Sequence, residues 1–245
     1  MEQVGLILTV WHKLICAVRN IACSRPSCHY WSECNKESTF MTQASQSHLA
    51  YLALEKLIVT LGVEPGAIVN ERQLIELTGH GRTPVREAIQ RLAWENLIRV
   101  RPRVGLQITH INPMDRNNIL QARRQLEPMA VALAAQNICE PLRRALEDCS
   151  GKMVQSSDND DILAFYEADK HLDEIVAEAC PNSFIASSLW PLQTHFRRIW
   201  FSSADSTALK TAVQMHLDII NALLDGNSER AEQADTKLLS HHATT

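Results

Sequence analysis

Arginine recurs through the stretch from Glu71 to Ile108. Between Arg82 and Arg103 the sequence holds six arginines and only two acidic residues. A guanidinium group forms paired hydrogen bonds with phosphate and with the edge of a guanine base, so a local excess of arginine favours a nucleic-acid partner. The whole chain has a formal net charge of −4, which argues against indiscriminate binding of nucleic acid. We therefore interpret the stretch as a surface that reads DNA.

A second group of residues suited to chemistry is the pair Asp169 and Asp173. They stand four residues apart and so share one face of a helix, on a stripe that is otherwise apolar. Two carboxylates directed into a core are costly unless Arg123, His216 or a bound cation pairs them. Three interpretations stay open. Asp169, Asp173 and His216 could hold a divalent metal. Arg123 or Arg197 could clamp the carboxylate of an organic effector. The group could also be a structural network without a ligand.

Composition and charge suggest how these groups are divided along the chain. A length of 245 residues allows two modest domains, and 45% apolar residues with few aromatics fit a soluble, helix-rich protein. Formal charges sum to +1 for residues 1–40, +2 for residues 41–111 and −7 for residues 112–245. A basic segment before an acidic one suits a protein that touches phosphate with one end. The seven cysteines follow no disulfide pattern, so we expect a reduced, cytoplasmic protein.

Residues 41–111 have the pattern of a winged helix–turn–helix DNA-binding domain. Helices are expected at 46–61, at Glu71–Thr78 and from Pro84 onward, with a sharp turn at Gly79–Gly81 between the last two. Two strands should follow, around a basic tip that ends in Gly105, and form the wing. The second helix of such a motif enters the major groove by its N-terminal end.

The segments on either side differ from this one. Residues 1–40 are poorly specified: their apolar part is too short and too interrupted to span a membrane, and their cysteines lack the close pair of a zinc site. We expect an upstream extension, with Met41 as the natural start. Residues 112–245 should form an all-α domain for effector binding and dimerisation, with helix breaks at Pro181-Asn182 and Gly226-Asn227.

Two motifs in the basic stretch carry a family resemblance. The sequence PGAIVNERQL from Pro65 to Leu74 and RTPVREAIQRL from Arg82 to Leu92 resemble the GntR family of bacterial transcriptional regulators. The family usually has a serine before the arginine of its RTPVRE run, and Gly81 stands there, so one phosphate contact is lost. The resemblance implies DNA contacts at the starts of the two reading helices and at the wing tip, namely Arg72, Arg82, Thr83, Arg86, Arg103 and Gly105.

The later part of the chain resembles the all-α effector domain, or FCD domain, of the FadR-type branch of this family. The matching pieces are ARRQLEPMAVALAA, the D-x3-D helix ending in AEACPN, and H-x2-I-x3-L-x2-G. In that branch an aspartate, a histidine four residues on and two later histidines often hold a divalent metal, which would be Zn, Mn, Ni or Mg. Here these positions fall on Asp169, Asp173, His216 and a place near Leu238, so two of the four ligands depart.

The sequence thus predicts a mainly α protein that regulates transcription and is not an enzyme. It should bind double-stranded operator DNA as a homodimer, act as a repressor, and respond to a small metabolite, an organic acid, at Arg123, Asp169, Asp173, Arg197 and His216. No membrane partner and no certain cofactor are expected. The alternative is a metal-dependent enzyme that uses Asp169, Asp173 and His216, but the sequence shows neither a supported nucleophile–base pair nor a glycine-rich phosphate loop.

Overall fold

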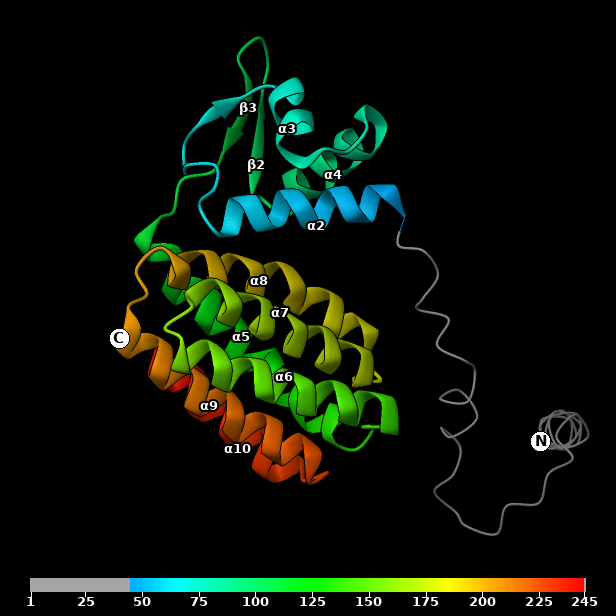
Figure 1. Cartoon of the computed structure of the whole chain (residues 1–245), viewed down its shortest axis with the longest axis vertical. Helices are drawn as coiled ribbons and strands as arrows, with labels where there is room; N and C mark the ends of the chain where they lie inside the picture. Colours follow the sequence, from blue (N-terminus) through cyan, green and yellow to red (C-terminus); the bar gives the residue numbers. More distant parts are fainter. Residues whose placement is uncertain (1–44, 245) are drawn as a thin grey trace, which may run out of the picture. The chain divides into compact units, whose positions relative to one another are not determined.

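A computed structural model describes residues 45–244 of the chain (Figure 1). The expectations for residues 1–40 and for a start at Met41 lie outside these residues. We use the name head for residues 45–111 and the name body for residues 112–244. Within the described residues, no helix is long and apolar enough to cross a membrane.

The head is a helix–turn–helix with a small sheet. Its helices are α2 (Gln46–Val59), α3 (Glu71–Thr78) and α4 (Arg82–Trp94), and its strands are β1 (Ile68–Val69), β2 (Ile98–Arg101) and β3 (Gly105–Ile108). The strands pair antiparallel in the order β1-β3-β2. The wing expected from the sequence is therefore the β2–β3 hairpin. The short strand β1 was not expected, and it pairs with the middle of β3.

Local signals set the boundaries of the reading helices. α3 begins at Asn70, which exchanges hydrogen bonds with Gln73 in a capping box, and it ends at Gly79 in the left-handed region. α4 begins after Gly81, which offers no side chain to cap the helix. Its inward face is buried in the head core and consists of Val85, Ala88, Ile89 and Leu92. Anchoring α4 by this face leaves its arginine-bearing N-terminal end exposed.

The wing needs a glycine at its end. Gly105 has a φ of 132°, and a side-chain carbon there would lie 2.9 Å from the carbonyl oxygen of Val69. Only glycine permits this close approach of β3 to β1. Arg103, at the tip, also has a positive φ of 65°, which turns the chain between the two strands.

The body is all helical, as the sequence predicts. Its helices are α5 (Pro113–Ala135), α6 (Glu140–Asp158), α7 (Ile162–Ala179), α8 (Ser183–Phe201), α9 (Ser206–Leu224) and α10 (Ser228–His242). α5 packs against α8 and α10, and α7 packs against α6. Side-chain oxygens accept backbone N–H groups at the starts of most of these helices, at Asn112, Asp161, Asn182, Asp205 and Asn227.

Head and body meet along α2 and α8. Glu55 of α2 is fully buried, is ion-paired with Lys170 of α7, and accepts a 3.0 Å hydrogen bond from the Thr194 hydroxyl of α8. Farther along the same contact, Trp190 Nε1 donates to the Tyr51 hydroxyl at 2.8 Å. We call this contact the seam, and it consists of Tyr51, Glu55, Glu95, Thr109, Lys170, Trp190, Thr194, His195 and Arg198.

Arg198 of α8 forms the contact of the seam that lies beside the end of the wing. Its guanidinium donates to the Thr109 carbonyl at 2.6 Å and to the Thr109 hydroxyl at 3.1 Å, while its Nε has no hydrogen-bond partner among the described residues. Burial lowers the pKa of Arg198 to about 10. His195 Nε2 lies 2.7 Å from the Glu95 carbonyl, just after α4. α8 is therefore bonded to the segments that follow both α4 and the wing.

Replacing Lys170 with methionine should lower the free energy of unfolding by about 3–5 kcal/mol, because it leaves the Glu55 carboxylate buried without its cation. Urea denaturation measures the change. The double variant Glu55→Gln/Lys170→Met should recover most of the loss. Lys152→Met, which breaks an exposed pair with Asp148, is the control. Equal stabilities of Lys170→Met and Lys152→Met would contradict the importance of the buried pair.

Candidate functional site

The first candidate site is an exposed hollow between α3 and α4. It is lined by Glu71, Arg72, Ile75, Glu76, Arg82 and Arg86. The structure therefore brings together three of the arginines that the sequence assigns to DNA contact. Thr83 is exposed next to Arg82, and the wing residue Arg103 is exposed at the hairpin tip.

Acidic side chains hold two of these arginines in place. Arg86 makes two hydrogen bonds to the Glu71 carboxylate, from a terminal nitrogen at 3.0 Å and from Nε at 3.2 Å. Arg72 donates from Nε to Glu76 at 2.8 Å. Glu71 was not among the expected site residues, although its position beside Arg72 at the helix start was visible in the sequence. It fixes the guanidinium of Arg86 across the gap between the two helices.

The second candidate site is a cavity of about 30 Å³ inside the body. Side chains from α5, α7, α8, α9 and α10 surround it, and all five residues expected to bind an effector are among them. A cavity of this size holds one or two water molecules. Its lining consists of Arg123, Phe165, Asp169, Asp173, Gln193, Phe196, Arg197, Trp200, Ala212, His216, Leu238 and His242.

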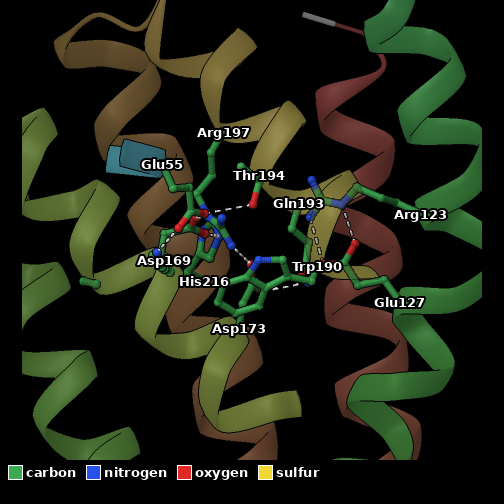
Figure 2. A network of polar contacts seen from close by, with 12 residues as sticks. Glu55, Arg123, Glu127, Asp169, Asp173, Trp190, Gln193, Thr194, Arg197 and His216 are labelled. Carbon is green, nitrogen blue, oxygen red and sulfur yellow. Dashed lines mark hydrogen bonds and ion pairs between the residues drawn. The ribbon is translucent and has the colours of Figure 1, made fainter. Parts of the chain in front are cut away.

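Arg197 is the cation that pairs the two aspartates (Figure 2). Its Nε donates to Asp169 at 2.6 Å and a terminal nitrogen donates to Asp173. The other oxygen of Asp169 lies 2.8 Å from Nε2 of His216. The sequence offered Arg123, His216 or a bound cation as partners, so the pairing with His216 is confirmed and the pairing with Arg123 is wrong.

Arg123 pairs instead with a carboxylate on its own helix. Glu127 follows it by four residues on α5 and accepts hydrogen bonds from its Nε at 2.5 Å and a terminal nitrogen at 2.8 Å. The side-chain amide of Gln193 joins the two halves of the network, donating at 2.9 Å to both Glu127 and Asp173. Both arginines at the cavity are thus satisfied by internal acids.

Burial and charge shift the pKa values of this network in opposite directions. Burial would raise the pKa of Asp169, but the hydrogen bond from His216 and the charge of Arg197 hold it well below its usual range. Burial would lower the pKa of His216, but Asp169 raises it. Burial raises the pKa of Asp173 to about 7, against the opposing charge of Arg197. Asp169 is therefore ionised at neutral pH, and its charge favours the protonated form of His216.

These residues do not fit the divalent metal that the resemblance implied at Asp169, Asp173 and His216. His216 Nδ1 lies 2.7 Å from the carbonyl oxygen of Ala212, which can only accept, so that nitrogen carries a hydrogen. Its other nitrogen is bonded to Asp169, and the guanidinium of Arg197 occupies the space between Asp169 and Asp173 where a metal would have to lie. Within residues 45–244 no group of three or more His, Cys, Asp or Glu side chains is placed to hold a metal ion.

Sequence reasoning missed several residues of this cavity. On α8, Gln193, Phe196 and Trp200 follow the helical spacing that places Arg197 there, and this periodicity could have found them. Asp235 on α10 is buried nearby, and one of its oxygens has no hydrogen-bond partner among the described residues. Burial, with the charge of Glu127, raises the pKa of Asp235 well above its usual value.

Comparison with family models matches both parts of the chain. Residues 46–108 match the family described as bacterial regulatory proteins, gntR family, and residues 118–242 match the FCD domain. The match to the FCD domain alone covers half of the chain.

Related proteins of known sequence are regulators of transcription. The HTH-type transcriptional regulator YdhC of Bacillus subtilis is 27% identical over 75% of this chain and 83% of its own length. A probable D-xylose utilization operon transcriptional repressor of Paenarthrobacter nicotinovorans is 29% identical over 72% of this chain and 76% of its own. The HTH-type transcriptional repressor RspR of Escherichia coli is 25% identical over 77% and 83%.

Solved structures share the fold. Escherichia coli McbR/YncC superposes with a TM-score of 0.71 at 19% identity and covers 82% of this chain and 96% of its own. A putative transcriptional regulator GntR from Rhodococcus sp. RHA1 superposes with a TM-score of 0.64 at 20% identity, over 82% and 97%. At these identities the likeness concerns the architecture.

His242 should make the protein less stable in mild acid. Burial, aided by the charges of Arg123 and His216, lowers the pKa of His242 to about 3, whereas in the unfolded chain it stays near 6.5. As the pH falls below 6.5, the unfolded chain takes up a proton that the folded protein does not, so stability is lost by about 1.4 kcal/mol per pH unit. His242→Gln should therefore gain about 2 kcal/mol relative to the wild type between pH 7 and pH 5.

Urea unfolding curves at several pH values measure this difference. Comparing each variant with the wild type cancels the titration of the acidic groups around the cavity, chiefly Asp169, Asp173 and Asp235. His242→Phe, which cannot titrate either, should show the same pH dependence. Curves for both variants that run parallel to the wild type would contradict a neutral, buried His242.

Proposed function

This chain belongs to the GntR family of bacterial regulatory proteins and carries the FCD domain, and on that premise we propose that it is a repressor whose binding to operator DNA is controlled by a small metabolite in the body. It is a DNA-binding transcriptional regulator, as its relatives are. The names of two relatives support the sign of regulation, because both are called repressors. The metal-dependent enzyme is not retained, since the family regulates transcription and Arg197 covers the two aspartates.

The hollow between α3 and α4 supports DNA reading by the head. The N-terminal ends of the two helices present arginines from one exposed surface. Glu71 holds the Nε–Nη2 edge of Arg86, and the other edge of this guanidinium, between Nη1 and Nη2, suits the two acceptors on the major-groove edge of guanine. The wing tip would touch the backbone or the minor groove. In a homodimer, two such heads would bind the half-sites of a palindromic operator in the cytoplasm. The residues proposed for these contacts are Arg72, Arg82, Thr83, Arg86, Arg103 and Gly105.

The effector would bind where Arg123 and Arg197 meet the cavity. We assign it the class of organic acids, because a guanidinium fork binds a foreign carboxylate as well as an internal one. Metabolite sites usually enclose roughly 300–1,000 Å³, so a cavity of about 30 Å³ must enlarge to admit one. The incoming carboxylate would displace an internal acid from its arginine and push the lining helices apart.

The observation that supports this proposed control is that α8 contacts both the cavity and the head. Gln193, Phe196, Arg197 and Trp200 line the cavity, while Trp190, Thr194, His195 and Arg198 bond to the head. Arg197 and Arg198 are adjacent in sequence, and one grips the aspartates while the other grips Thr109. A ligand that changes the partners of Arg197 therefore acts on the helix that holds the head. If the ligand binds one position of α8 more tightly than another, the difference between the two binding free energies is available to control the head.

Arg86→Ala should weaken operator binding about 10- to 100-fold, because a bidentate contact to a base contributes about 1–3 kcal/mol. The operator can be selected from random DNA with the wild-type protein, and fluorescence anisotropy then measures both affinities. Binding to random DNA should fall much less. Arg144→Ala, which removes an exposed arginine paired with Glu140 on the body, is the matched control. Equal losses on operator and random DNA would contradict base reading by Arg86.

The coupling through α8 can be separated from effector binding. A screen of mono- and dicarboxylates by thermal shift should find a stabilising ligand, which at a hundredfold excess over its Kd contributes about 2.7 kcal/mol. In the wild type this ligand should weaken operator binding at least about tenfold, a coupling of roughly 1.4 kcal/mol. Arg198→Met should keep the thermal shift but lose most of the change in operator binding, because the bond to Thr109 is gone.

Two controls make this experiment decisive. Arg144→Met should behave as the wild type in both measurements, since it lies outside the cavity and the seam. Ala212→Val, which fills part of the cavity, should lose the thermal shift and the coupling together. If Arg198→Met retains full coupling, the signal does not pass through the seam. If no carboxylate stabilises the protein, the effector is not an organic acid.

A further inference from the structure

We propose that Arg197 is the permanent cation of the body, in the position where the family resemblance implies a divalent metal, and that the site therefore has no need of a metal ion. This goes beyond the proposed function, because it concerns what holds the site together whether or not an effector binds there. Three features of the cavity support it: the reach of Arg197, the charge that it supplies, and the side chain at the fourth ligand position.

The reach of Arg197 matches the task of a bridging cation. Its planar fork donates to Asp169 from one nitrogen and to Asp173 from another, so one group holds both carboxylates, as a metal between them would. Its side chain is only 7% exposed, and the space left in the cavity is about 30 Å³. The guanidinium and a metal ion could not occupy the space between these two carboxylates together.

The two aspartates already have a cation beside them. Asp173 stands where the resemblance implies a neutral histidine, so this chain has a second acid at that place. Arg197 supplies a positive charge that contacts both acids. A divalent ion added to this group would be buried next to the Arg197 cation, and repulsion between the two charges is strongly unfavourable.

The fourth ligand position is apolar. The resemblance places the last histidine of the metal set near Leu238, and in the structure Leu238 lines the same cavity. Its side chain has no lone pair to offer a metal. The leucine removes one ligand of the family's set, the aspartate replaces another, and Arg197 is bonded to both remaining acids, so the three residues form one consistent set.

If Arg197 blocks metal binding, removing its side chain should create a metal site. Full-length protein without a polyhistidine tag is stripped with EDTA and titrated with NiCl2 or ZnCl2, with calorimetry and thermal shift as readouts. Adding metal should raise the Tm of the wild-type protein no more than it raises the Tm of His216→Ala. Arg197→Ala frees Asp169, Asp173 and His216, and should bind Ni²⁺ at least about tenfold more tightly than the wild type.

The family's ligand set can also be rebuilt in this chain. The triple variant Arg197→Ala/Asp173→His/Leu238→His should bind Ni²⁺ or Zn²⁺ more tightly still, and adding His216→Ala should abolish the gain. Arg123→Ala is the matched control, because it removes the other buried arginine from the same cavity but leaves Arg197 on the two aspartates. It should gain no metal binding.

The full chain carries cysteines and histidines outside the described residues, so every metal count is compared with His216→Ala. Wild-type protein that holds one metal per chain, lost in His216→Ala, would overturn the proposal. Failure of both the single and the triple Arg197 variant to gain metal while remaining folded, as judged by circular dichroism, would overturn it too. If Arg197→Ala does not fold, Arg197→Gln replaces it, since the amide is neutral but fills much of the same space.

Discussion

A carboxylate buried in a helical bundle needs a cation, and this constraint governs the centre of the body. Asp169 and Asp173 lie one turn apart on α7, and both point into the cavity that Arg197 enters from α8 (Figure 2). Leaving either acid without its partner would cost several kcal/mol, because the low-dielectric interior replaces water as its surroundings. Arg197 is buried with the two acids because each charge offsets the desolvation of the others. Removing any one of the three groups would leave the rest without a partner. The register between α7 and α8 is therefore fixed by charge as well as by packing.

The same constraint connects the cavity to the DNA-reading surface. α8 cannot shift without moving Arg197 away from α7, and it cannot turn without moving Thr194 and Arg198 away from α2 and Thr109. Glu55 of the head is fully buried against α7 and α8 and is ion-paired with Lys170 of α7. This buried pair also attaches the head to the body, and it tolerates little displacement. Because both attachments involve desolvated charges, a movement that separates these partners without providing others is costly. A helix held in this way is suited to occupy discrete positions.

The head could be predicted from the sequence because its signals are local. Asn70 with Gln73, Gly79 and Gly105 each specify a cap or a turn from neighbouring residues alone, and the helices and wing followed. Strand β1 could not be predicted, since two residues carry no pattern and become a strand only by pairing with β3. The same distinction applies to the cavity, where helical periodicity placed Asp169 and Asp173 on one face of α7 but could not identify the partners across it. Arg123 was offered as a partner of these two aspartates, although Glu127, four residues later on the same helix, was the nearer candidate.

Under the proposed function, the network would serve ligand binding more than stability. A buried set of ion pairs contributes little to folding, because the energy of pairing is largely spent on desolvation, and an apolar core of similar volume would serve as well. The body already has such a core around Leu146, Met153 and Leu223. What a guanidinium with exchangeable acids can do, and a leucine cannot, is accept another carboxylate at nearly equal energy. Since Asp173 has its pKa raised to about 7 by burial, it can take a proton and give up Arg197 at a lower cost than Asp169, whose pKa is held low. The two acids on Arg197 thus differ in how readily they leave, and Asp173 is the one that an entering anion would replace.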